Sequence, residues 1–451
     1  MCRFSAVVSA LLASLSACGD DGANRLPDAP PAPDDAAVDS PAPVTTVNIT
    51  TLARRYDSLA PGAPRAGVMV FGVSAANTLV SSAVTDAAGK ATLSLPDGGS
   101  VTAVYDNGGS KVPNLVITYV GVKPGDALTF GDRTTEHAPT TGQTGTMTLS
   151  WAPVTNATHY RVYSPCYRTG YTMDTEATID LAEYCQTPTA PVGLVAYDDS
   201  ETVLASVLLP AAPYTPGSTL AIAANQWVAQ PAGNLQIDLV NLDAAVTDAD
   251  IGGVDELGAG ELGPFWWSYP PITFRVTPKG GTASQVVSVA EAAPRKSAAA
   301  KLHHETRVGR IWAFKAATTS PVAIDTANAP WIDTLTLAPD GRTVSWTQTA
   351  GTYDAALLRF VWSAFDWTVI LPPGVTMFEV PAPPAELAPY LPMAKDEVYL
   401  RTCQLVDLAS AASYDALRAL PEWRATDSER SVRAGEETQV INADCGEGYH
   451  F

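Results

Sequence analysis

Residues 86–96, Asp-Ala-Ala-Gly-Lys-Ala-Thr-Leu-Ser-Leu-Pro, decide the fold of the segment around them. The first four predict a turn in which Gly89 adopts a positive φ, and the following residues alternate between polar and apolar as a half-buried strand does. Residues 67–73 are apolar on both faces, which predicts a strand inside a core. With further strands expected at 77–85, 100–105 and 115–122, the regular spacing predicts a β-sandwich over residues 47–133.

The stretch from Thr85 to Leu93, with Leu95-Pro96 after it, is similar to the centre of carboxypeptidase regulatory-like, transthyretin-like domains. The resemblance covers roughly 60 residues. It implies a non-catalytic sandwich of the kind that is appended to exported proteins.

Residues 140–330 predict a second sandwich region. Thr146–Trp151 alternates cleanly, and Tyr160 follows Trp151 by nine residues. This arrangement resembles the early strands of fibronectin type III domains, in which the tryptophan fills the core. Residues 265–325 either complete this sandwich or form a short unit of their own.

Residues 331–451 predict a third sandwich, because Ser345-Trp346 repeats the layout of Ser150-Trp151. The match is weak residue by residue, so duplication and chance likeness both stay open. The one helix we predict, Leu408–Leu420, would begin at Asp407 as N-cap and end before Pro421. The whole sequence therefore predicts an all-β fold: tandem immunoglobulin- or transthyretin-like β-sandwiches and one short C-terminal helix.

The N-terminus has the pattern of a bacterial lipoprotein export signal. Arg3 supplies a positive charge, residues 4–15 form an uncharged apolar stretch, and Leu15-Ser16-Ala17-Cys18 has the spacing of a lipobox. We expect residues 1–17 to be removed and Cys18 to carry the acyl chains that hold the protein on a membrane. The alternative is an ordinary signal peptide with a chance cysteine near its cleavage site.

The segment after Cys18 supports the lipoprotein interpretation. Residues 19–46 contain six Asp, six Pro and six Ala among 28 positions. Such a segment cannot bury enough apolar surface to offset its ordering entropy, so we predict that residues 18–46 form a disordered tether. At ~3.1 Å per residue, this tether would reach about 80 Å.

Composition limits the classes of partner. The chain carries a net charge of −20, and removal of residues 1–17 takes away only Arg3, which leaves −21. This acidity repels nucleic acid and anionic headgroups, so we expect no nucleic-acid partner. No later stretch reaches eighteen consecutive apolar residues, so we expect the lipid to be the only membrane attachment.

The cysteines agree with export. Cys2 leaves with the signal, and the four that remain beyond the lipid site are Cys166, Cys185, Cys403 and Cys445. An even number in an exported protein predicts disulfides, and of the three pairings we favour the local ones, 166 with 185 and 403 with 445. A metal site of four thiolates is the alternative, although no Cys-x-x-Cys pair is present to form it.

The sequence carries none of the common catalytic motifs: no Gly-x-Ser-x-Gly, His-Glu-x-x-His, P-loop or Gly-x-Gly-x-x-Gly. His303-His304-Glu305 is the one concentration of ligand-type side chains. Neighbours on a strand point to opposite faces, so the two histidines could not share a metal there, and we interpret them as solvated loop residues. We expect no enzyme activity and no cofactor.

A weak calcium candidate lies in the acidic stretch 243–261, which we interpret as a loop. Its carboxylates Asp248, Asp250, Asp255 and Glu256 stand near several glycines, and calcium needs six to eight oxygen ligands together with a flexible backbone. The stretch lacks the ligand spacing of an EF-hand. A solvated acidic loop is therefore the favoured interpretation.

Two aromatic clusters are the best sign of a binding surface. Phe265, Trp266, Trp267 and Tyr269 follow the acidic stretch, and Trp362, Phe365 and Trp367 form a second group. Flat rings stack on sugars or peptides, although core packing is the more common role of such residues. We treat the first cluster as a candidate ligand-binding surface.

From lipobox to tandem sandwiches, the chain resembles multidomain lipoproteins of Gram-negative bacteria. We expect a non-enzymatic protein of the cell envelope, anchored by its lipid in the outer membrane, on either its periplasmic or its surface side. Its sandwiches would bind a glycan, a peptide or a protein. The alternatives are a structural or assembly component without a small ligand, and a hydrolase built from scattered carboxylates.

Overall fold

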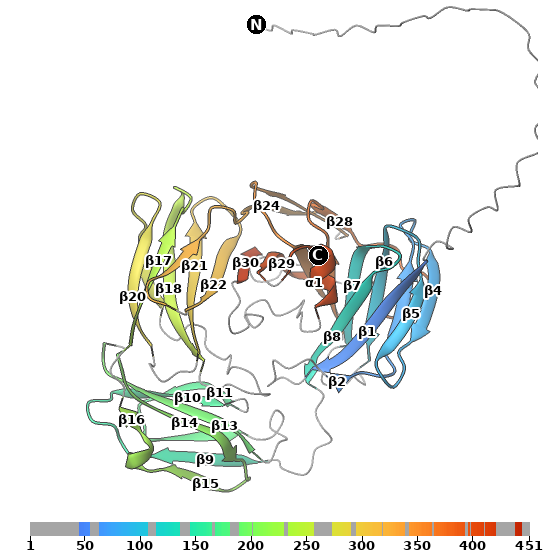
Figure 1. Cartoon of the computed structure of the whole chain (residues 1–451). Coiled ribbons are helices and arrows are strands. Elements are labelled where there is room, and N and C mark those ends of the chain that lie inside the picture. The colour runs from blue at the N-terminus through green and yellow to red at the C-terminus, as the bar shows by residue number, and fades with distance from the viewer. Residues whose placement is uncertain are drawn as a thin grey trace, which may run out of the picture. The chain divides into compact units, whose positions relative to one another are not determined.

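The computed structural model describes residues 45–54, 63–106, 114–135, 145–164, 167–180, 189–200, 202–229, 233–256, 273–289, 295–317, 319–338, 342–362, 365–392, 396, 398–409, 411–420 and 438–443 (Figure 1). The predicted signal peptide, Cys18 and nearly all of the predicted tether lie outside these residues. Within them, no helix has the length and apolar character needed to span a membrane.

The predicted all-β fold is confirmed, and the described strands form four β-sandwiches (Figure 1). Sandwich 1 contains β1 (Thr46–Arg54), β2 (Ala63–Pro64), β3 (Met69–Val73), β4 (Leu79–Val84), β5 (Lys90–Ser94), β6 (Gly99–Tyr105), β7 (Asn114–Val122) and β8 (Ala127–Thr135). Sandwich 2 contains β9 (Thr146–Trp151), β10 (His159–Ser164), β11 (Tyr167–Thr172), β12 (Glu176–Asp180), β13 (Thr189–Tyr197), β14 (Val203–Pro213), β15 (Thr219–Ile222), the 3-10 helix η1 (Ala224–Gln226) and β16 (Val228–Ala229).

The remaining elements form two further sandwiches. Sandwich 3 contains β17 (Gly233–Val240), β18 (Val246–Glu256), β19 (Thr273–Val276), β20 (Ala283–Val289), β21 (Arg295–His304), β22 (Arg310–Ala316) and β23 (Val322–Asp325). Sandwich 4 contains β24 (Ile332–Leu337), β25 (Thr343–Gln348), β26 (Ala355–Trp362), β27 (Phe365–Leu371), β28 (Met377–Glu379), β29 (Tyr399–Leu408), the helix α1 (Tyr414–Ala419) and β30 (Thr438–Ala443).

One strand order recurs in sandwiches 1, 2 and 3, and sandwich 4 follows it in part. In sandwich 2, β9 pairs antiparallel with β12 and parallel with β15, and the facing sheet runs β11-β10-β13-β14. In sandwich 3, the sheet of β17, β20 and β23 faces the sheet β19-β18-β21-β22 in the same order. In sandwich 1, the sheet of β1, β5 and β8 faces the sheet β4-β3-β6-β7. In sandwich 4, β25 takes the first place and β24 pairs with it antiparallel.

The strand order bears on the fibronectin type III resemblance and on the repeated Ser-Trp pair. In immunoglobulin-type sandwiches the first two strands share a sheet, whereas β9 and β10 lie in different sheets, so the fibronectin type III resemblance of Trp151 and Tyr160 is not confirmed. Trp151 lies on β9 and Trp346 on β25, the strand that takes the place of β9 in sandwich 4, and both are buried. The repeated Ser-Trp therefore marks equivalent positions.

Three sandwiches share a single twelve-stranded sheet. The β7 edge of sandwich 1 pairs in parallel with β27 of sandwich 4, and β30 of sandwich 4 pairs antiparallel with β22 of sandwich 3. Hydrogen bonding thus crosses the boundaries at residues 133 and 331 that the sequence predicts.

The cores lie on opposite faces of this sheet. At the β7–β27 junction, Trp367 stands beside Val116, and both belong to the core that sandwiches 3 and 4 share. Their neighbours Ile117 and Ile370 point to the other face, into the core of sandwich 1. Both faces of the sheet are therefore apolar along the junction.

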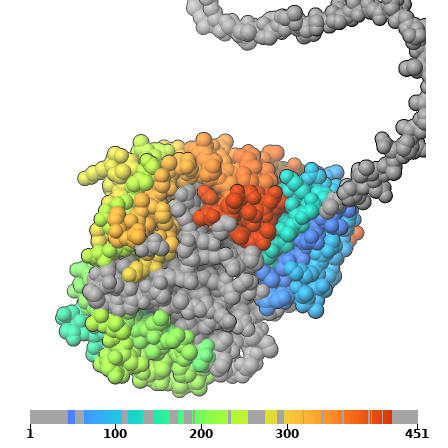
Figure 2. All heavy atoms as spheres, in the orientation of Figure 1, coloured from blue at the N-terminus to red at the C-terminus, as the bar shows by residue number. Residues whose placement is uncertain are grey.

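The helix α1 contacts both strands of the β7–β27 junction. The hydroxyl of Tyr414 lies 2.9 Å from the carbonyl oxygen of Val120 on β7 and 2.8 Å from that of Ile370 on β27. Arg418, 1% exposed, places Nη2 2.8 Å from the carboxylate of Asp126, which precedes β8. In Figure 2 the red atoms of the C-terminal part lie against the cyan atoms of sandwich 1.

The helix begins later than the sequence predicts. Ser413, not Asp407, is the N-cap, and its hydroxyl accepts the amide of Ala416. Residues up to Leu408 continue β29, because Val406 and Leu408 bury their side chains in the core of sandwich 1. Tertiary burial thus overrides the helical pattern.

The turn at residues 86–89 is confirmed. The Asp86 carboxylate accepts the amides of Ala88 and Lys90 at 2.8 and 2.9 Å, and Gly89 has φ +65°. A Cβ at Gly89 would stand 2.4 Å from the carbonyl oxygen of Thr51 on β1. The turn therefore packs so closely on β1 that it requires glycine.

Replacement of Tyr414 by Phe tests the junction. We expect the free energy of unfolding to fall by about 1–3 kcal/mol, because two buried carbonyl groups lose their shared donor. Urea unfolding followed by circular dichroism measures it. Tyr390→Phe is the control, because that hydroxyl contacts only the weak acceptor Sδ of Met69 at 3.6 Å, and an equal loss in both variants would contradict the assignment.

Asp354 makes stability depend on pH. Burial raises the pKa of its carboxyl to about 6, although the Leu408 amide donates to it at 2.7 Å. Because the folded-state pKa exceeds the unfolded value, this stabilisation is complete below pH 3.8 and is lost as the pH rises through about 6. When the pH is lowered from neutral to acidic, the unfolding free energy of the native chain should rise by about 1–3 kcal/mol relative to that of Asp354→Asn. Urea unfolding at several pH values measures this. A difference that stays constant with pH would contradict this.

Candidate functional site

The candidate site lies on the outer face of the β18–β21 pair, and the alternation of β18 creates it. Ala249 and Ile251 point into the core and are fully buried, so Asp248 and Asp250 point together to the opposite face. Two carboxylates that are two residues apart on a strand necessarily stand side by side.

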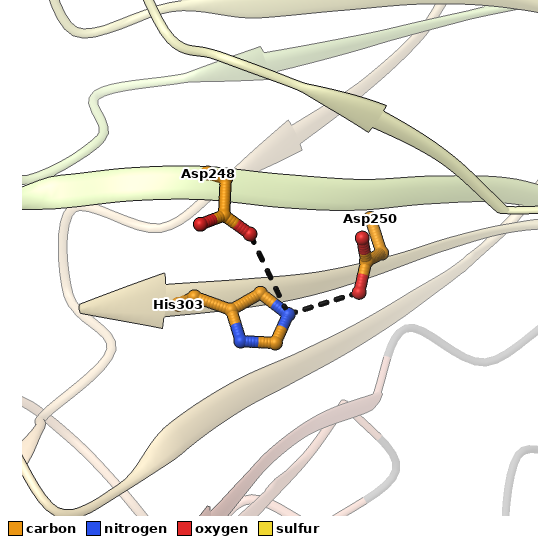
Figure 3. A group of neighbouring side chains, drawn as sticks. All are labelled: Asp248, Asp250 and His303. Carbon is orange, nitrogen blue, oxygen red and sulfur yellow. Dashed lines mark hydrogen bonds and ion pairs between the residues drawn. The ribbon is translucent and has the colours of Figure 1, made fainter. Parts of the chain in front are cut away.

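The neighbouring strands add two basic side chains. His303 on β21 stands opposite Asp248, and Arg275 on β19 stands opposite Asp250. Figure 3 shows the His303 ring directed at both carboxylates. Antiparallel register therefore assembles the site from residues that are up to 55 positions apart.

The distances describe a compact network. His303 Nε2 lies 2.9 Å from Asp250 Oδ2 and 3.9 Å from Asp248 Oδ1. Arg275 Nε lies 3.0 Å from Asp250 Oδ1 and 3.3 Å from Asp248 Oδ1. The hydroxyl of Thr247 donates to the second oxygen of Asp248. Each carboxylate is therefore held from more than one side.

The electrostatics favour the ionised form of Asp250. Burial opposes the ionisation of Asp250, but the hydrogen bonds and positive charges of Arg275 and His303 outweigh it and hold the pKa of the carboxyl below its usual value. Asp250 thus acts as a permanent anion near neutral pH.

These residues could hold a metal ion only after a rearrangement. Asp248, Asp250 and His303 each offer one ligand atom, and these atoms lie within 4.8 Å of one another. A nitrogen and two carboxylates suit Zn²⁺ or Mn²⁺ better than Ca²⁺, which takes six to eight oxygens. Arg275, whose side chain is 65% exposed, would have to leave the carboxylates first.

The interpretation of the acidic stretch 243–261 as a loop, made for the weak calcium candidate, is wrong for residues 246–256. Residues 246–256 form the strand β18, so the backbone cannot wrap around an ion. In the strand register Asp255 and Glu256 stand opposite Lys296 and Arg295, about 16 and 20 Å along the strand from Asp250 at ~3.3 Å per residue. The structure brings together only Asp248 and Asp250 of the four candidates.

The interpretation of His303 and His304 as loop residues is also wrong, because both lie on β21. The expected alternation is confirmed: His303 faces the aspartates, whereas the side chain of His304 is 2% exposed and lies 5.1 Å from the Trp331 ring. Burial lowers the pKa of His304, and the positive charge of Arg307 adds to this. His303 therefore belongs to the candidate site, whereas His304 is buried on the opposite face of the strand.

The other predicted residues divide between the core and the undescribed part of the chain. In the second aromatic group, Trp362 and Trp367 are 3% and 1% exposed, which confirms core packing. Cys403 is buried on β29 opposite Ala443, two residues before Cys445, and both disulfides stay predictions. Outside the described residues lie Cys18, Cys166, Cys185, Cys445, Phe265, Trp266, Trp267 and Tyr269.

No known family profile and no curated protein matches the chain. Among solved structures it is similar to the TIE protein of Bacillus anthracis, with 13% identity over 62% of this chain and 49% of that one and a TM-score of 0.16. A leucine-rich repeat protein from Bacteroides thetaiotaomicron shares 14% identity over 41% of this chain and 26% of that one (TM-score 0.14). A putative adhesin from Bacteroides ovatus shares 12% identity over 66% of this chain and 92% of that one (TM-score 0.15).

The chain therefore spans about half the length of the TIE protein and about a quarter of the leucine-rich repeat protein. At these TM-scores the alignments do not establish a shared overall fold.

Asp250→Asn tests the network. We expect a loss of about 0.5–1 kcal/mol in unfolding free energy at neutral pH, because the carboxylate is partly exposed and its ion pairs are screened. The stabilisation exists above the unfolded pKa of 3.8 and is lost as the pH falls through the lower folded-state pKa, so the two chains should converge in acid. Urea titrations of both measure this. The exposed hairpin residue Asp199 provides the control, Asp199→Asn, and an equal loss there would refute the assignment.

Proposed function

We propose that the protein is a non-enzymatic, lipid-anchored component of the cell envelope whose β-sandwiches bind a glycan, peptide or protein. The observation that carries the proposal is the repetition of one sandwich strand order, complete in three sandwiches and partial in the fourth, downstream of a lipobox and an acidic tether. Repeated sandwiches supply many loops and sheet surfaces on a rigid frame, and binding residues concentrate on such surfaces.

The candidate site supports a binding or structural role over hydrolysis. A glycosidase of the common type needs two carboxyls whose environments push their pKa values apart, so that one stays protonated. Here the pKa of Asp250 is lowered, and both Asp248 and Asp250 contact Arg275 and His303. Neither carboxyl has the apolar surroundings of a general acid.

The first sandwich supports the same role. Its central turn matches the segment that resembles carboxypeptidase regulatory-like domains, and the structure builds this turn with a capping aspartate and a required glycine. We propose that sandwich 1 is of this non-catalytic class. The outer membrane, on either its periplasmic or its surface side, is the proposed location.

Cys18→Ala tests the anchor. We expect the native chain to sediment with membranes and the variant to be unattached, because no acyl chain can be added. Cys2→Ala is the matched control, since Cys2 would be removed with the signal. Membrane fractionation and protease shaving of intact cells measure both attachment and side. A native chain that stays soluble, or a Cys2→Ala chain that detaches, would refute the proposal.

A further inference from the structure

A cleft of about 250 Å³ opens between sandwich 1 and sandwich 4. One wall is the outer face of β6 and β7, and the other is formed by Trp367, by β28 and by the segment that follows β28. The volume equals roughly eight liquid waters at ~30 Å³ each, so the cleft fits a small molecule and not an extended chain.

The floor of the cleft has one more hydrogen-bond donor than it can use internally. Trp367 Nε1, which can only donate, lies 2.9 Å from the hydroxyl of Thr118, and that hydroxyl lies 2.9 Å from the hydroxyl of Thr102. The indole and the two hydroxyls supply three donor hydrogens, and the two contacts use two of them. One hydroxyl hydrogen therefore remains for an acceptor atom, although Thr102 and Thr118 are only 2% and 5% exposed.

The rim is polar and carries a single charge. Ser74, Asn77, Ser100 and Glu379 surround the opening, and no basic side chain is among the lining residues. The amide nitrogen of Asn77 donates to the carbonyl oxygen of Ala382, which ties the β3–β4 turn to the opposite wall. Glu379 repels anionic ligands and accepts hydrogen bonds from hydroxyl groups, while the nearby Arg342 guanidinium donates to the carbonyl oxygens of Val380 and Pro381 at 3.1 and 3.2 Å.

Apolar surface completes the lining. The rings of Trp367 and Phe378 lie 5.8 Å apart, and Leu387 and Leu391 close the wall beside them. Phe378 is the partly exposed ring, whereas Trp367, Leu387 and Leu391 are buried behind it. A ligand that suits this cleft presents a C–H face to Phe378, an acceptor oxygen to the threonine floor and hydroxyl donors to the rim.

We propose that this cleft binds a single neutral sugar ring, free or at the end of a glycan. A neutral sugar combines apolar ring faces with hydroxyl groups on its edge, and it carries no charge to repel Glu379. The inference rests on the binding role proposed above and assigns that role to one site and one class of ligand.

The test uses the purified full-length lipoprotein in a detergent without sugar headgroups, such as lauryldimethylamine oxide. The probes are the methyl glycosides of glucose, galactose and mannose, N-acetylglucosamine, and glucuronic acid as an anionic comparison. Saturation-transfer NMR detects binding, and tryptophan fluorescence gives the affinity. We expect at least one neutral probe to bind, and glucuronic acid to bind more weakly than the best of them.

Two variants place the binding in the cleft. Ser100→Phe fills the opening and should weaken binding at least about ten-fold, and Thr102→Val removes one floor hydroxyl and should weaken it about three- to ten-fold. Ser82→Phe is the matched control, because Ser82 is an exposed serine on β4 at the edge of the same sheet and does not line the cleft. Thermal melting confirms that all three variants fold.

The proposal is overturned if no neutral probe binds the native chain, if Ser100→Phe binds as the native chain does, or if glucuronic acid binds as tightly as the best neutral sugar. These failures are separate from failure of the proposed function. If attachment requires Cys18 but no sugar binds, the proposed envelope role stands and the proposed sugar ligand is wrong. A chain that binds sugar but does not need Cys18 keeps the cleft and loses the anchor.

Discussion

The parallel pairing of β7 with β27 is the interaction on which the rest of the described structure depends. It joins strands that are some 250 residues apart, and it makes the sheet of the first sandwich continuous with that of the last. Each partner alone would expose an edge strand whose two faces are both apolar, which is an aggregation hazard. The pairing removes both edges at once, so neither sandwich is complete without the other.

This constraint explains features that otherwise look unrelated. Arg418 is buried near the junction because it pairs with Asp126 and Asp415 and lies 4.5 Å from the Tyr414 ring. A buried guanidinium is costly unless its charge is matched, and here carboxylates from both sandwich 1 and α1 match it. Charge matching of this kind contributes less to net stability than to fixing which surfaces meet.

Strand content and turns could be predicted from the sequence because they depend on neighbours in the chain. The Asp86 turn and the 67–73 strand lie where local pattern and glycine chemistry place them. The apolar character of 67–73 on both faces held further information: Val70 packs inside sandwich 1, whereas Phe71 packs against the core of sandwich 4. A single sequence gives no means to tell a strand central to one core from a strand shared between two.

The candidate sites depend on register between distant strands, which a single sequence does not specify. Asp248 and Asp250 were recognisable as a pair, but the loop interpretation hid the strand that aligns them, and nothing near them pointed to His303, some 55 positions away. The cleft is further still from local pattern, because Thr102 and Thr118 read as ordinary strand residues until β27 brings Trp367 beside them. The same junction that closes two sheet edges thereby creates a hydroxyl floor and the wall that faces it. In this chain, the closed sheet edges and the lining of the cleft both follow from one strand pairing.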